Sequence, residues 1–201
     1  HTRLRCDWSS ECALPIYEYV HLALSETVGP VDLPSWLNEG TATYYEYLIN
    51  VSGERANATK HPLYRSTGIA ENAARSGNLL ALTNLEDQDA WNSQTEEDRI
   101  DLQYAQSHMA VRYLAETYGT STPIDMMKRM GQGATLSEVF SEIVGVEYPA
   151  FERQFTLWLK SREDPKRNQI AEYTRSLKEI MSGKASIGDP RSMDLAREPR
   201  L

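Results

Sequence analysis

Apolar residues recur at spacings of three and four along most of the chain, and this periodicity is typical of amphipathic α-helices. Strand-like alternation of apolar and polar residues is scarce. Pro15 suits the first turn of a helix over 14–28, and Gly29 and Pro30 end that helix. The same pattern predicts further helices over 34–52, 61–76, 95–119, 123–131, 135–144, 148–163 and 166–181. The expected fold class is therefore mainly α.

Local signals refine three of these elements. Asp32 is a candidate N-cap for the helix that starts near residue 34. Thr135 and Glu138 have the spacing of a capping box, which opens the helix over 135–144. Residues 78–95 show no clear period, and we expect a long loop there.

Two aromatic groups are candidates for the core. The helix over 148–163 carries one apolar face, formed by Phe151, Phe155, Trp158 and Leu159. A tyrosine cluster in the helix over 34–52 is expected to pack this helix against the preceding one; it consists of Tyr44, Tyr45 and Tyr47.

The composition suits one globular domain with an appendage. The chain has 201 residues, of which 40% are hydrophobic and 25% are charged. We expect an N-terminal extension over 1–13, a helical domain over 14–163, and a C-terminal helix with a loose tail over 164–201. The tail is polar, and it is expected either to be loose or to lie along a partner.

Charge and hydropathy exclude two classes of partner. The net charge is −8 and no basic stripe is visible, so we expect neither nucleic acid nor an anionic membrane as a partner. No apolar run approaches the ~18 residues of a transmembrane helix. The chain begins with His1, as expected of a processed product, a domain or a fragment. Cys6 and Cys12 are read as a small-loop disulfide or as two free thiols, and a disulfide would favour an exported protein.

The candidate chemistry lies in residues 15–21, Pro-Ile-Tyr-Glu-Tyr-Val-His, which differ by one residue from the zinc-binding pattern H-E-x-x-H. On a helix, Tyr17 and His21 are one turn apart on the same face, with Glu18 beside them. In zinc peptidases this geometry lets two imidazoles bind the metal while the glutamate activates a water molecule. Glu39 follows on the next predicted helix, within Trp-Leu-Asn-Glu-Gly over 36–40.

These residues resemble the gluzincin metallopeptidases of clan MA, and most closely the bacterial peptidase MA-like domains. The resemblance continues through QYAQSHMAVRYLAETYG over 103–119 and through 126–159, so that it covers about residues 14–160. It implies the helical, C-terminal-type part of a gluzincin domain. In gluzincins a β-sheet precedes the metal helix, and the 16 residues before Tyr17 are too few for most of that sheet.

The resemblance also implies residue roles. His21 and Glu39 correspond to zinc ligands, and Glu18 corresponds to the general base. Tyr104 corresponds to a tyrosine that hydrogen-bonds the oxyanion, and His108, one turn further, could approach the same cleft. Tyr17 departs from the pattern, which has a histidine at this position. A phenol has a reference pKa of about 10, so it is neutral near pH 7 and is a poor metal ligand.

Three functional readings follow. The chain is an impaired peptidase-like domain that binds a peptide or protein partner without zinc, or an active zinc peptidase with Tyr17, His21 and Glu39 as ligands, or a helical subunit of a larger assembly. Whether it is an enzyme stays open. Without the motif, His21 would be read as a core histidine and Glu39 as a surface carboxylate. A further alternative is that Tyr17 is an engineered or misassigned residue.

Overall fold

The structure is a computed structural model that describes residues 13–52 and 62–162. The chain divides into two compact units, His1–Lys160 and Ser161–Leu201, and the helices below belong to the first unit up to Lys160. The predictions for Cys6, for Cys12 and for the helix over 166–181 lie outside the described residues. The proposed boundaries at 13 and 163 stay predictions.

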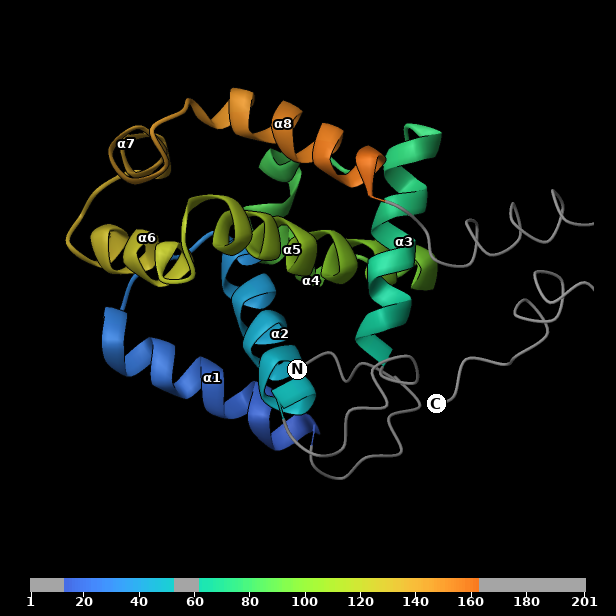
Figure 1. The fold of residues 1–201 in the computed structure, drawn as a ribbon. Coiled ribbons are helices and arrows are strands. Elements are labelled where there is room, and N and C mark those ends of the chain that lie inside the picture. Colours follow the sequence, from blue (N-terminus) through green and yellow to red (C-terminus); the bar gives the residue numbers. More distant parts are fainter. Residues whose placement is uncertain (1–12, 53–61, 163–201) are drawn as a thin grey trace, which may run out of the picture. The chain divides into compact units, whose positions relative to one another are not determined.

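The described residues are helical, with irregular connections and no strand, so the prediction of a mainly α fold is confirmed (Figure 1). None of these helices has the length and apolar character needed to cross a bilayer. The elements, in chain order, are α1 (Ala13–Val28), α2 (Ser35–Ser52), α3 (Pro62–Ser76), the 3₁₀ helix η2 (Leu82–Leu85), α4 (Gln88–Asn92), α5 (Glu97–Tyr118), α6 (Thr122–Gly131), α7 (Leu136–Val139), the π-helical turn η3 (Phe140–Val144) and α8 (Tyr148–Ser161).

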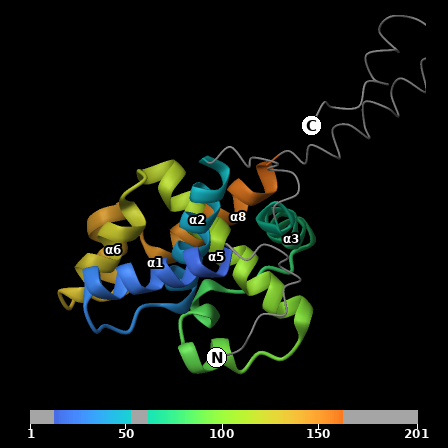
Figure 2. The same cartoon turned by 90° about the horizontal axis from the view of Figure 1, so that it is seen from below.

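Helix α5 is the central element, and it packs against α2 and α3, while α1 packs against α2 and α6 (Figures 1 and 2). The contact between α2 and α5 depends on Gly40. A Cβ atom there would meet the carbonyl oxygen of Ser107, and it would lie 2.7 Å from the Ser107 carbonyl carbon and 2.9 Å from Val111 Cγ2. Only glycine permits this approach of the two backbones. The crossing therefore determines where the preceding residue, Glu39, stands.

An aromatic cluster joins the start of α2 to η3 and α8. The ring of Trp36 lies 6.5 Å from that of Phe140 and 6.4 Å from that of Phe151, and Phe140 lies 4.9 Å from Phe151. Phe151, Phe155 and Leu159 are almost completely buried, which confirms the predicted apolar face of α8. Burial of large aromatic side chains of this kind contributes much of the stability of a small helical core.

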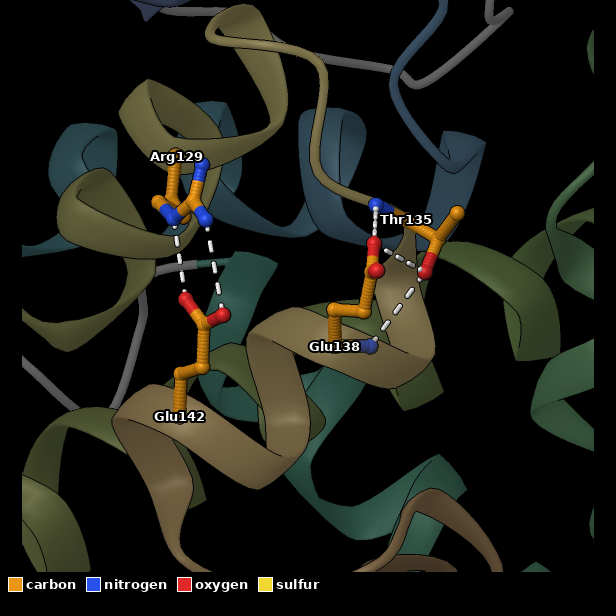
Figure 3. A network of polar contacts seen from close by, with 4 residues as sticks. All are labelled: Arg129, Thr135, Glu138 and Glu142. Atoms are coloured by element: carbon orange, nitrogen blue, oxygen red, sulfur yellow. Dashed lines mark hydrogen bonds and ion pairs between the residues drawn. The ribbon is translucent and has the colours of Figure 1, made fainter.

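Polar contacts fix the chain around α7 (Figure 3). The Thr135 hydroxyl accepts the Glu138 N–H at 3.3 Å, and the Glu138 carboxylate accepts the Thr135 N–H at 2.8 Å, which confirms the predicted capping box. The Arg129 guanidinium of α6 donates to both carboxylate oxygens of Glu142 on η3, at 2.9 and 3.4 Å. These exposed contacts orient α6 and η3, but they stabilise the fold little because water screens them.

The prediction of a long loop over 78–95 is wrong, since the segment contains η2 and α4. The Asp87 carboxylate accepts the Ala90 N–H at 2.7 Å and so caps α4, while Trp91 is buried. The Gln106 amide of α5 bonds both backbone groups of Leu80, at 2.6 and 3.0 Å. Helices of four or five residues are too short to show a period, so the packing of this segment was not visible in the sequence.

Two local predictions on α2 are also wrong. Asp32 does not cap the helix, which begins at Ser35 with the Pro34 carbonyl accepting the first helical N–H groups. The rings of Tyr44 and Tyr47 lie 6.5 and 5.7 Å from the ring of His108. Tyr44 and Tyr47 therefore pack α2 against α5, with which α2 makes its most extensive contact, and not against α1 as predicted; for Tyr45 the prediction stays a prediction.

Candidate functional site

Three of the predicted site residues meet where α1 packs on α2. The Tyr17 hydroxyl donates a hydrogen bond to Oε2 of Glu39. The same oxygen lies 3.5 Å from Nε2 of His21. The rings of Tyr17 and His21 stand edge to face, with their centroids 4.7 Å apart, as expected for residues one turn apart on a helix. One carboxylate oxygen is thus the common partner of a phenol and an imidazole.

The short connection between α1 and α2 reverses the direction of the chain and so positions Glu39. Gly29, with φ of +82°, ends α1 in the left-handed conformation that favours glycine. The connection over 29–34 then brings α2 against α1, and Gly40 lets α2 settle on α5. Glu39 therefore faces α1 at the level of Tyr17 and His21.

The electrostatics of the site favour a neutral phenol. Burial raises the pKa of Tyr17 well above its ordinary value, and the charge of Glu39, the neighbouring Tyr104, the hydrogen bond to Glu39 and the charge of Glu18 act in the same direction. A phenolate at this position would be desolvated and would face a carboxylate. Tyr17 is therefore a hydrogen-bond donor to Glu39 at neutral pH.

The pKa of the His21 imidazole is set by contributions that oppose one another. Burial lowers its pKa, but hydrogen bonding to Glu39, the charge of Glu39, a hydrogen bond with Asn38 and the charge of Glu18 together outweigh burial, so the pKa of His21 is raised. Protonated His21 would form an ion pair with Glu39.

The donor set does not fit a catalytic zinc ion. Such an ion takes three protein ligands and keeps one position open for water. Here one imidazole and one carboxylate are present, and the phenol that stands at the third position donates its proton to the carboxylate. Over residues 13–52 and 62–162, no three His, Cys, Asp or Glu side chains are placed to hold a metal ion. We therefore derive no catalytic step through a metal.

The other predicted residues lie at different depths. Glu18 is exposed on α1, and its charge acts on both Tyr17 and His21. Tyr104 is half-buried on α5, with its ring edge to face against Trp91 at 5.0 Å, and its hydroxyl acts on the pKa of Tyr17. Glu18 and Tyr104 thus border the cluster of Tyr17, His21 and Glu39, from α1 and α5.

His108 lies in the core of the fold, one helical turn after Tyr104 on α5. Its side chain is completely buried between α2 and α5, against the rings of Tyr44 and Tyr47. The interface of the two helices encloses the imidazole, and the prediction that it could approach the same cleft as Tyr104 stays a prediction.

A groove of about 930 Å³ adjoins the cluster at His21. It follows the last two turns of α1 and the connection over 29–34, and it faces residues 86–89 at the start of α4. The sequence did not indicate this groove, because residues 86–89 were predicted to lie in an irregular loop. The only signal in the sequence was Asp87 three residues before Ala90, which is the spacing of an N-cap.

Comparison with known proteins places these features in a family. A family model described as the peptidase MA superfamily matches residues 5–161. The match includes α1, α2 and α5, which carry Tyr17, His21, Glu39 and Tyr104. No curated protein and no solved structure matches the chain significantly.

Proposed function

Since the chain belongs to the peptidase MA superfamily, we propose that it is a metallopeptidase-like domain whose hydrolytic site is impaired and which serves in binding or structure. The observation that carries this proposal is the hydrogen bond from Tyr17 to Glu39. It joins the residue that replaces the first histidine of the motif to the residue that would be the acidic ligand.

The hydrogen bond opposes metal binding in two ways. A metal ion at Glu39 would have to displace the Tyr17 hydroxyl from Oε2, and a phenol is a useful ligand only after it loses its proton. That loss is disfavoured because burial and the charge of Glu39 raise the pKa of Tyr17. One imidazole and one carboxylate then remain, which is fewer than a catalytic zinc ion requires.

The same contacts give the cluster a structural role. A hydrogen bond to a charged acceptor contributes about 1.5–3 kcal/mol when it is shielded from water. The cluster of Tyr17, His21 and Glu39 therefore stabilises the contact between α1 and α2, and it does so without a metal. In this way a fold retains its shape after its chemistry is lost.

Metal analysis of the wild-type chain and three variants tests the proposal. We expect the wild-type chain to bind no stoichiometric zinc and the Tyr17→His variant to gain zinc, because a second imidazole would then stand one turn from His21. The matched control is Tyr19→His, since Tyr19 lies on the same helix but is 67% exposed and points away from Glu39. Stoichiometric zinc in the wild-type protein that is lost in Tyr17→Phe would refute the proposal.

A second candidate is an active zinc peptidase in which Tyr17, His21 and Glu39 bind the metal, Glu18 is the general base and Tyr104 binds the oxyanion. The convergence of the three side chains favours it. On this reading Glu18→Gln abolishes cleavage of a quenched fluorescent peptide library, whereas Glu26→Gln, an exposed control on the same helix, does not. Cleavage that survives Glu18→Gln would remove this candidate.

The binding partner in the first proposal is a peptide or a protein. Tyr19 and Leu22 are 67% and 57% exposed on α1, so a larger assembly could use this helix as a contact. Light scattering during size-exclusion chromatography tests the assembly role, and a well-behaved monomer would argue against an obligate subunit.

A further inference from the structure

The groove beside His21 has both apolar and polar lining residues. Its apolar lining includes Leu24 and Val28 of α1, Met130 of α6 and Leu136 of α7. Its volume of about 930 Å³ is at the upper end of the range for ligand sites. His21 is among its lining residues, as are residues 29–34, so an occupant would lie next to the cluster of Tyr17, His21 and Glu39 and beside the connection between α1 and α2.

The connection offers unpaired backbone groups to this groove. Val31, Asp32 and Leu33 line it, and their N–H and C=O groups make no hydrogen bond to any other described residue. Pro34 restricts Leu33 to extended conformations. An extended segment with open backbone groups is the surface that a peptide in strand conformation can pair with.

Apart from His21, the ionisable side chains that line the groove are all acidic. Asp32, Glu86, Asp87 and Asp89 line it, while neither Lys nor Arg is among its lining residues. Asp32 and Asp89 are exposed, and neither carboxylate forms an ion pair with a described residue. A cleft lined by carboxylates raises the local concentration of cationic ligands.

The geometry points to a docking site for an extended peptide that carries lysine or arginine side chains, with its backbone along Val31–Leu33 and its cations against Asp32 and Asp89. This inference rests on the proposed binding function, and it specifies the chemistry of the partner. Successive side chains of an extended peptide point to opposite sides, so the bound peptide would present two sets of side chains. One set would contact Leu24 and Val28, and the other would contact the carboxylates of Asp32 and Asp89.

Fluorescence polarisation with three labelled hexapeptides on the full chain tests the inference. The peptides alternate valine with lysine, with glutamine or with glutamate. We expect the lysine peptide to bind more tightly than the glutamine peptide and the glutamate peptide not to bind, and we expect salt to weaken the lysine peptide. A lysine peptide with N-methylated backbone amides should bind more weakly, because it cannot pair with the connection.

Matched variants locate the site. Asp32→Asn with Asp89→Asn should weaken the lysine peptide by about fivefold, as expected for the loss of two partly exposed ion pairs. Asp98→Asn removes the same kind of charge from an exposed position at the start of α5, outside the groove, and it should leave binding unchanged. Equal binding of the three peptides, equal binding by the groove variant and the control, or binding of a second copy of the chain in place of peptide would each overturn the inference.

Mass spectrometry of the recovered peptide separates this inference from the proposed function. An intact bound peptide supports both. A peptide that binds in the groove but is cleaved would refute the impaired site while leaving the docking site standing. Absence of binding by a zinc-free, inactive protein would refute the docking site alone.

Discussion

Replacing Gly40 by alanine tests whether the crossing of α2 and α5 positions Glu39. The new Cβ would lie 2.7 Å from the Ser107 carbonyl carbon and 2.9 Å from Val111 Cγ2, whereas ordinary contacts begin at 3.4 Å. The helices would have to separate by about 0.7 Å, and the atom on one side is backbone, which cannot turn away. Overpacking of this kind costs roughly 1–3 kcal/mol.

The intrinsic gain of alanine over glycine in a helix opposes this loss by about 1 kcal/mol. We therefore expect Gly40→Ala to lower the free energy of unfolding by up to about 2 kcal/mol. Gly68→Ala is the matched control, because Gly68 lies within α3 and a Cβ there would meet nothing within 4 Å. That variant should gain about 0.5–1 kcal/mol.

Urea unfolding followed by far-ultraviolet circular dichroism measures both variants against the wild-type chain. The expected result is a lower midpoint for Gly40→Ala and a higher midpoint for Gly68→Ala, with similar slopes. A midpoint for Gly40→Ala equal to or above that of the wild type would refute the argument that the close approach at Ser107 determines the crossing.

Three further changes follow from burial and capping. Burial raises the pKa of the Glu46 carboxyl to about 7. The wild-type free energy of unfolding should therefore fall by up to about 3 kcal/mol as the pH rises from about 4.5 through 7. Urea titrations of Glu46→Gln at the same pH values should lack that decline. Asp87→Ala removes the acceptor of the Ala90 N–H and should lower stability by about 1 kcal/mol, whereas an unchanged urea midpoint would argue against the cap. Phe151→Ala opens the aromatic cluster and should lower stability by about 3–5 kcal/mol, and a loss below 1 kcal/mol in the same assay would contradict the packing described.

Helical periodicity alone predicted only part of the candidate site. The edge-to-face contact of Tyr17 with His21 was predictable, because residues four apart share a helical face whatever surrounds them. The approach of Glu39 required in addition that two helices joined by a short connection lie together, which the family resemblance implied. The ligand and base roles of these residues stay predictions.

Other features had no local signature. The tyrosines at 44 and 47 were assigned to the wrong neighbour, because a helix surface does not identify the helix that covers it. The acidic groove needs Asp32 and residues 86–89 to lie on opposite sides of one space, although more than 50 residues separate them in the chain.

The sequence by itself determined the longer helices of the described residues, their ends at glycine and proline, the capping box at Thr135 and the buried face of α8, because each depends on residues within a few turns of one another. Only the tertiary structure decided that the phenol of Tyr17 bonds Glu39, that His108 is enclosed, and that a groove adjoins His21. These depend on the approach of α2 to α5 at Gly40 and on packing between distant segments, where the shapes of both partners set the result.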